Sequence, residues 1–128
     1  MSAGPRVLIV EDDADVREAI VSAVEDQKIP CLQAANGLEA LELLERETPP
    51  PDVILLDVMM PVMDGWGFRA RQQATPRLAS IPVVVLTAHA SARETAEKMD
   101  AAGFLRKPVD LDLPIDTIRR LGPRTAAG

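Results

Sequence analysis

The chain has 128 residues, of which 47% are hydrophobic, and a formal net charge of −6. This length suits one domain with a substantial core, and no apolar run approaches the roughly 20 residues of a membrane span, so we expect a cytoplasmic protein. The acidic balance and the 2% aromatic content argue against direct nucleic-acid binding, which needs cationic groups and stacking platforms. The single Cys31 cannot form an internal disulfide and is interpreted as a packing residue.

Short apolar runs predict the strands. The segments 7–10, 53–56 and 83–86 are rich in β-branched residues and too short for independent helices, so they are interpreted as strands buried on both faces. Two less apolar segments, 30–34 and 103–106, suit strands nearer the edges of a sheet. The sequence therefore predicts five strands.

Segments with helical spacing of apolar residues separate these strands. Four apolar stripes begin at Val16, Leu38, Ala92 and Leu111, and a weaker helix is expected after Asp64, with Thr75-Pro76 as its stop. The capping spacing of three residues recurs in the pairs Asp15 and Glu18, Asn36 and Glu39, and Ser91 and Glu94. Strands that alternate with helices predict a doubly wound α/β fold, with a parallel sheet covered by helices on both faces. Residues 122–128 are expected to form a disordered tail.

Polar residues follow four of the predicted strands. Glu11 and Asp12 follow the first strand, and Asp57, Thr87 and Lys107 end the third, fourth and fifth. In open parallel sheets the binding crevice lies beyond the carboxyl ends of the strands. We therefore expect these side chains to converge on one polar site.

The chemistry of these side chains indicates a metal-assisted phosphate site. Clustered carboxylates repel one another unless a cation lies among them, and an all-oxygen set favours Mg²⁺. Lys107 offers a charge and Thr87 a hydroxyl to phosphoryl oxygens. Since Asp57 leaves the central strand, it is the best-placed nucleophile, and the product would be an acyl phosphate.

Four motifs carry a resemblance to a known family. They are Val-Leu-Ile-Val-Glu-Asp-Asp at 7–13, Leu-Leu-Asp-Val-Met-Met-Pro-Val-Met-Asp-Gly at 55–65, Leu-Thr-Ala at 86–88, and Lys107-Pro108. From residue 7 to about 121 the chain resembles the receiver domains of two-component response regulators, of the single-domain, chemotaxis-regulator-like kind. The resemblance implies a flavodoxin-like strand order 2-1-3-4-5 and a receiver domain over residues 5–121.

The resemblance also implies roles for residues of the acidic site. Asp57 would be the phosphoacceptor and also a ligand of Mg²⁺. Glu11 and Asp12 would be the acidic pair that holds the ion, with Asp12 the more direct ligand. The backbone carbonyl of Met59 would complete the protein's share of the metal shell. Asp13 is interpreted as a bystander that caps a helix.

Further residues are implied to take part in switching. Thr87 and Lys107 would contact the phosphoryl group, and Phe104 falls where the family has its aromatic switch residue. Met59 and His89 occupy the variable positions that tune phosphoryl lifetime. The Lys107-Pro108 bond is expected to be cis.

Two features depart from the family pattern. The stretch from Thr87 to Lys107 is about two residues shorter than usual, and Asp100 stands where a glycine is common. Both departures fall on or beside the helix that follows the fourth strand. That helix belongs to the family's output face.

These features favour a signalling module over two other functions. A histidine kinase or phosphotransfer protein would donate the phosphoryl group to Asp57, and the change would switch a surface for an unknown downstream protein, without separate substrate turnover. A magnesium-dependent phosphatase with an aspartyl nucleophile usually has a second acid where Met59 stands. A flavodoxin-like domain that only binds a ligand leaves the carboxylates unexplained. A stand-alone regulator, a relay intermediate and a receiver from a longer protein all remain open.

Overall fold

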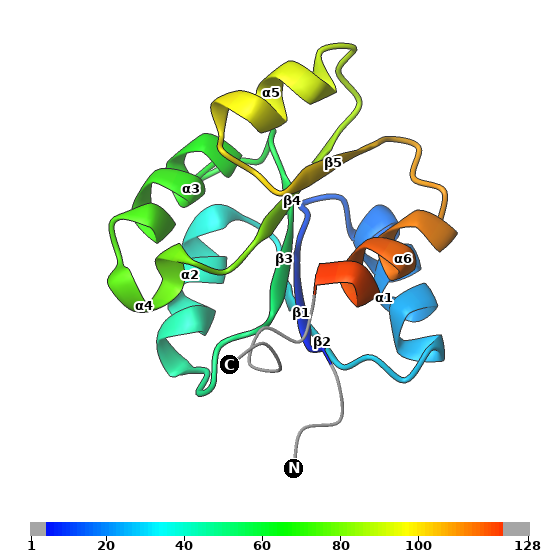
Figure 1. The fold of residues 1–128 in the computed structure, drawn as a ribbon, viewed down its shortest axis with the longest axis horizontal. Helices are drawn as coiled ribbons and strands as arrows, with labels where there is room; N and C mark the ends of the chain where they lie inside the picture. Colours follow the sequence, from blue (N-terminus) through cyan, green and yellow to red (C-terminus); the bar gives the residue numbers. More distant parts are fainter. Residues whose placement is uncertain (1–4, 122–128) are drawn as a thin grey trace.

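The computed structural model describes residues 5–121, which form one five-stranded parallel sheet with helices on both faces (Figure 1). The sheet order is β2-β1-β3-β4-β5, as expected. The strands are β1 (Val7–Val10), β2 (Cys31–Ala34), β3 (Val53–Asp57), β4 (Val83–Thr87) and β5 (Gly103–Arg106). The helices are α1 (Ala14–Asp26), α2 (Gly37–Arg46), α3 (Gly65–Gln73), α4 (Pro76–Ala79), α5 (Ala92–Lys98) and α6 (Asp112–Leu121). The expected tail at 122–128 lies outside the described residues.

The sheet separates two hydrophobic layers. Figure 1 shows α2, α3, α4 and α5 on one side of the strands, and α1 and α6 on the other. Alternate residues of one strand serve the two layers, so that Val83 and Val85 pack with α2, α3 and α5, whereas Val84 and Leu86 pack with α1 and α6. All residues of β1, β3 and β4 are buried. The strand predictions are thus confirmed, and β3 and β4 each extend one residue further, to Asp57 and Thr87.

The helix starts differ from the expectations in three places. Asp13 caps α1 as expected, because its side chain accepts hydrogen bonds from backbone N–H groups of the first turn, but Asp15, which was also expected to cap, lies within that turn. Asn36 caps α2 as expected. Ser91 precedes α5, but its side chain makes no capping hydrogen bond. The one-turn helix α4 was not expected: Pro76 stops α3 and then starts α4, since a proline needs no N–H at the first helical position.

Helix α5 has only seven residues, in keeping with the short stretch between Thr87 and Lys107. Asp100 follows it with a positive φ of 54°, a conformation that glycine adopts more readily. The Lys107-Pro108 bond is cis, as expected. Among residues 5–121, no helix is long and apolar enough to cross a bilayer.

Candidate functional site

The parallel sheet brings the ends of four strands to one edge. Asp57 is the last residue of β3 and pairs with Leu86 of β4, one residue before Thr87. The Lys107 N–H donates to the Thr87 carbonyl at 3.0 Å, so the chain beyond β5 stays beside the end of β4. The Glu11 N–H donates to Ala34, which holds the segment after β1 against β2. The expected convergence is therefore present in the backbone.

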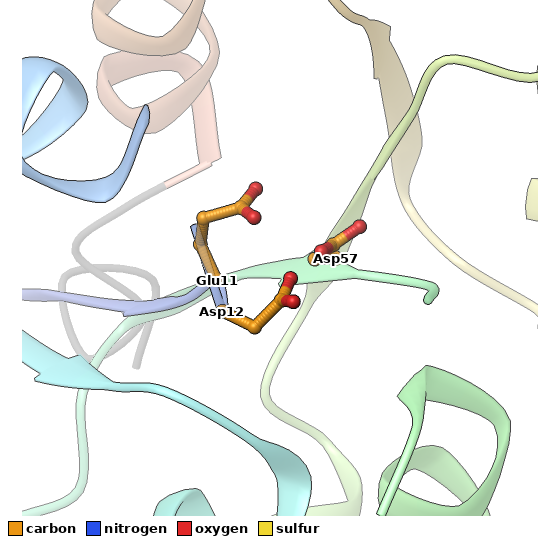
Figure 2. Close-up of side chains that lie close together, drawn as sticks. All are labelled: Glu11, Asp12 and Asp57. Carbon is orange, nitrogen blue, oxygen red and sulfur yellow. The ribbon is translucent and has the colours of Figure 1, made fainter. Parts of the chain in front are cut away.

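Three carboxylates gather at this edge. One oxygen from each of Glu11, Asp12 and Asp57 lies within 4.8 Å of the others, a spacing at which they could hold a metal ion. Figure 2 shows the three side chains together, Glu11 and Asp12 from the segment after β1 and Asp57 from β3. Glu11 and Asp57 are buried, whereas Asp12 is exposed. The cluster is therefore open to solvent on the side of Asp12.

Lys107 enters the same cluster from the chain after β5. Its Nζ lies 2.7 Å from Oε1 of Glu11 and 3.3 Å from Oδ1 of Asp57. Apart from this ammonium, the buried Oε1 of Glu11 has no partner among residues 5–121. One ammonium balances only one of the three carboxylates. The surplus of negative charge and the poorly partnered buried oxygen both fit a hard divalent cation.

The cluster perturbs the ionisation of its own members. Burial first, and the neighbouring charge of Glu11 second, raise the pKa of Asp57 from 3.8 to about 7, although the charge of Lys107 acts in the opposite direction. Burial by itself lowers the pKa of Lys107, but Glu11 and Asp57 together raise it above its ordinary value. Asp57 thus holds a proton more readily than an ordinary aspartate, and a cation beside it would favour the carboxylate form.

The remaining predicted residues lie on β4 and β5 or in the segments that follow β3 and β4. Thr87 is buried at the end of β4, and its Oγ1 accepts a hydrogen bond of 3.1 Å from the His89 N–H. Met59, two residues past Asp57, has a side chain that is 74% exposed. Phe104 is partly buried, and two guanidinium groups lie near its ring: that of Arg93 at 5.5 Å and that of Arg106 at 6.0 Å from the centroid. Such distances allow cation–π contacts.

Sequence reasoning missed two residues that shape the site. Arg17 of α1 donates from Nη1 to the Glu11 carbonyl at 2.7 Å, and so holds the segment that carries the acidic pair. A Cβ on Gly65 would lie 2.7 Å from the Asp57 carbonyl oxygen, so only glycine lets α3 begin this close to β3. Arg17 has no sequence signal beyond a charged helix face. Gly65 stands in the Asp-Gly pair of the 55–65 motif, which was a usable signal.

Comparisons with known proteins agree with this architecture. A family model described as response regulator receiver domain matches residues 7–119. An uncharacterised 14.6 kDa protein from Leptolyngbya boryana is 37% identical over 115 residues, which are 88% of this chain and 84% of that protein. Response regulator MprA of Mycobacterium leprae is 36% identical over 94% of this chain and 52% of its own length.

Solved structures share the fold as well. The receiver domain of the Francisella response regulator 1452 superposes with a TM-score of 0.81 at 30% identity, covering 91% of this chain and 95% of that one. The chain thus spans about half the length of MprA but nearly all of this receiver domain. On the match of the family model, which covers most of its length, the chain belongs to the response regulator receiver domain family.

Proposed function

We propose that this chain accepts a phosphoryl group on Asp57 and thereby switches a partner-binding surface. The donor is the phosphohistidine of a histidine kinase or of a phosphotransfer protein, and Mg²⁺ is the cofactor. The observation that supports this proposal is the position of Asp57: a buried carboxylate at the end of the central strand, clustered with Glu11 and Asp12 and 3.3 Å from Lys107.

The chain's own side chains account for most of the chemistry. A carboxylate oxygen of Asp57 attacks the phosphorus in line, while the phosphorus–nitrogen bond breaks and its electron pair stays on the donor imidazole. Glu11, Asp12 and Asp57 would hold Mg²⁺ together with the Met59 carbonyl, and the ion would supply positive charge that stabilises the phosphoryl oxygens. Lys107 donates to one of these oxygens, and Thr87 donates its hydroxyl to another.

The same contacts provide a route to a changed surface. In this structure the Thr87 hydroxyl accepts a hydrogen bond from the His89 N–H. To reach the phosphoryl group, it turns away from that N–H. The backbone bond from Lys107 to Thr87 couples the ends of β4 and β5. Phe104, partly buried between these strands and α5, then rotates inward and biases a two-state surface.

The partners follow from this chemistry. A phosphohistidine donor and an unknown downstream protein are the expected partners. The cytoplasm is the compartment that we propose for this chain. Direct nucleic-acid binding is not part of the proposal, because a net charge of −6 opposes contact with phosphates. The structure offers no specific support for phosphatase turnover: Met59 stands where a second acid would be needed, and its thioether cannot transfer a proton.

Intact mass spectrometry tests the proposal. The protein is incubated with acetyl phosphate in the presence of Mg²⁺ or of a chelator, beside Asp57→Asn and the exposed control Asp116→Asn. We expect one added phosphoryl group in the wild type and in Asp116→Asn, dependent on Mg²⁺ and absent in Asp57→Asn. Steady turnover of a phosphate ester would instead support the phosphatase, and no mass gain in the wild type would refute phosphorylation.

A further inference from the structure

Helix α3 carries two buried polar side chains that the acidic site does not use. Arg69 is 7% exposed and Gln72 is fully buried. The Arg69 guanidinium donates to the Met99 carbonyl at 2.8 Å, to the Asp100 carbonyl at 2.6 Å and to the Gln72 side chain at 2.7 Å. Gln72 in turn donates to two carbonyls of the connection between α3 and β4, those of Leu78 and Ile81. A buried cation thus links α3 to the end of α5.

The C-terminal end of α5 is held by several bonds at once. The Asp100 N–H donates to Glu97 and the Ala101 N–H to Ala96, the paired bonds of a Schellman motif. The carbonyls of Met99 and Asp100, directly after the helix, accept from Arg69. A cation at this end also complements the negative end of the helix dipole. Burial lowers the pKa of Arg69, but the charge of Asp100 opposes that effect.

Within residues 5–121, the N-terminal end of α5 has no comparable buried polar bond. Ser91, at the capping position, makes no side-chain hydrogen bond to the first turn, and its Oγ lies 3.0 Å from Nδ1 of the exposed His89. The segment 88–90, which leads from Thr87 to this end, is exposed. A helix of seven residues is too short to be stable by itself, so tertiary contacts decide where each end lies.

We propose that Arg69 is a positioning residue that fixes the C-terminal end of α5 to α3, so that the change linked to phosphorylation displaces the N-terminal end of α5, next to Thr87. The inference rests on the proposed function. Moving the C-terminal end would strip a buried guanidinium of its acceptors. Moving the N-terminal end disturbs only the small buried side chain of Ala92, the exposed contact between His89 and Ser91, and the contact of Arg93 with the Phe104 ring. The shorter α5 therefore acts as a helix hinged at Asp100.

Amide hydrogen exchange, followed by NMR on the full chain, measures the local stability of the two ends of α5 separately. The samples are the unphosphorylated protein and the protein kept in excess acetyl phosphate and Mg²⁺, with occupancy checked by intact mass. The Thr95 amide, bonded to Ser91, reports the first end, and the Met99 and Ala101 amides report the second. We expect phosphorylation to change exchange at Thr95 at least threefold and at the other two less than 1.5-fold. Equal changes at both ends would overturn the inference.

Variants test the role of Arg69 directly. Arg69→Met should speed exchange of the Met99 and Ala101 amides at least tenfold in both states and abolish the difference between the ends, while Asp57 is phosphorylated within twofold of the wild-type rate. Arg71→Met, the same change on an exposed arginine of α3, should leave all these values within twofold. Unchanged exchange at Met99 in Arg69→Met would refute the anchoring.

A conservative variant keeps the test usable if Arg69→Met fails to fold. Arg69→Lys retains the charge but has one donor atom in place of a fork, so we expect intermediate exchange at Met99 and Ala101. If the Met99 and Ala101 amides of Arg69→Lys exchange as slowly as in the wild type, the several N–H donors of the guanidinium are not what anchors α5. If the wild type gains no phosphoryl group, the proposed function and the hinge both fail, but the variants still decide in the unphosphorylated protein whether Arg69 anchors α5.

Discussion

Lys107 Nζ lies closer to Oε1 of Glu11, at 2.7 Å, than to Oδ1 of the proposed phosphoacceptor Asp57, at 3.3 Å. The lysine therefore neutralises a buried glutamate in this structure, and that glutamate oxygen has no other partner among the described residues. A phosphoryl group on Asp57 would offer the ammonium a stronger acceptor nearby. Lys107 is thus expected to have two separate roles: it pairs with Glu11 in the unphosphorylated protein, and it contacts the phosphoryl group when Asp57 is phosphorylated.

Lys107→Met tests the structural part of this pairing. Because the change leaves a buried carboxylate oxygen unpaired, we expect a loss of about 2 kcal/mol in the free energy of unfolding without metal, partly restored by Mg²⁺. Urea denaturation with and without Mg²⁺ measures it. The control is Lys98→Met, which removes an exposed ion pair with Glu94 and should cost under about 1 kcal/mol. Equal losses of unfolding free energy in the two variants would contradict a stabilising pairing of Lys107 with Glu11.

The raised pKa of Asp57 predicts a pH dependence of stability. Between pH 3.8 and about 7 the folded state binds more protons than the unfolded state, so the free energy of unfolding falls as pH rises through this window. Asp57→Asn removes this titrating group. At pH 8 without metal, its free energy of unfolding should exceed that of the wild type by about 2–4 kcal/mol, whereas at pH 4 the two should be equal. Urea denaturation in a chelator measures both. The same pH slope in both proteins would show that Asp57 titrates normally.

Gly65→Ala tests the close contact between α3 and β3. The new Cβ would lie 2.7 Å from the Asp57 carbonyl oxygen, so the backbone must shift, at a cost of about 1–3 kcal/mol and with slower phosphorylation. Gly103→Ala is the matched control, since nothing lies within 4 Å of its Cβ. Thermal unfolding and the rate of mass gain with acetyl phosphate provide the two measurements. If Gly65→Ala unfolds at the same temperature as the wild type and is phosphorylated at the same rate, the proposed steric constraint is ruled out.

Lys28→Gly should stabilise the protein. Lys28 has a φ of 65° directly after the capping residue of α1, where Ile29 and Lys28 close a Schellman motif. Glycine adopts this conformation without a clash, so we expect a gain of about 0.5–1 kcal/mol. In the control Lys98→Gly, within α5, glycine should destabilise by a similar amount. A loss of stability in Lys28→Gly, measured by urea denaturation, would contradict this prediction.

Met59 and His89 are predicted to tune the lifetime of the acyl phosphate. Both side chains are exposed, and each lies two residues past a site residue, Met59 after Asp57 and His89 after Thr87. From these positions we expect them to affect the approach of water. We expect Met59→Ala and His89→Ala each to change the half-life of phosphorylated Asp57 by several fold. Loss of the added mass after removal of acetyl phosphate measures it, with Leu113→Ala, an exposed change on α6, as control. An unchanged half-life in both variants would end this hypothesis.

Most of the fold could be predicted because its signals are local. Buried parallel strands require short apolar runs, and all five strands were found within one residue at either end. Helix starts were harder, since Ser91 has the right spacing to Glu94 but its hydroxyl lies against His89. Helix α4 was missed because one turn leaves no apolar period, and Pro76 was interpreted only as a stop.

The sequence by itself determined the five strands, the helices other than α4, and the set of polar residues at the strand ends. These residues could be expected at one site because parallel strands place their carboxyl ends at one edge. Only the tertiary structure decided how these groups pair. Lys107, Glu11 and Asp57 come from the ends of three different strands, and the lysine pairs with both carboxylates. Arg69 has the sequence signature of a solvated helix residue, but it is buried and donates to a carbonyl thirty residues away. Such pairings depend on burial and distance between remote segments, and neither quantity is encoded in local periodicity.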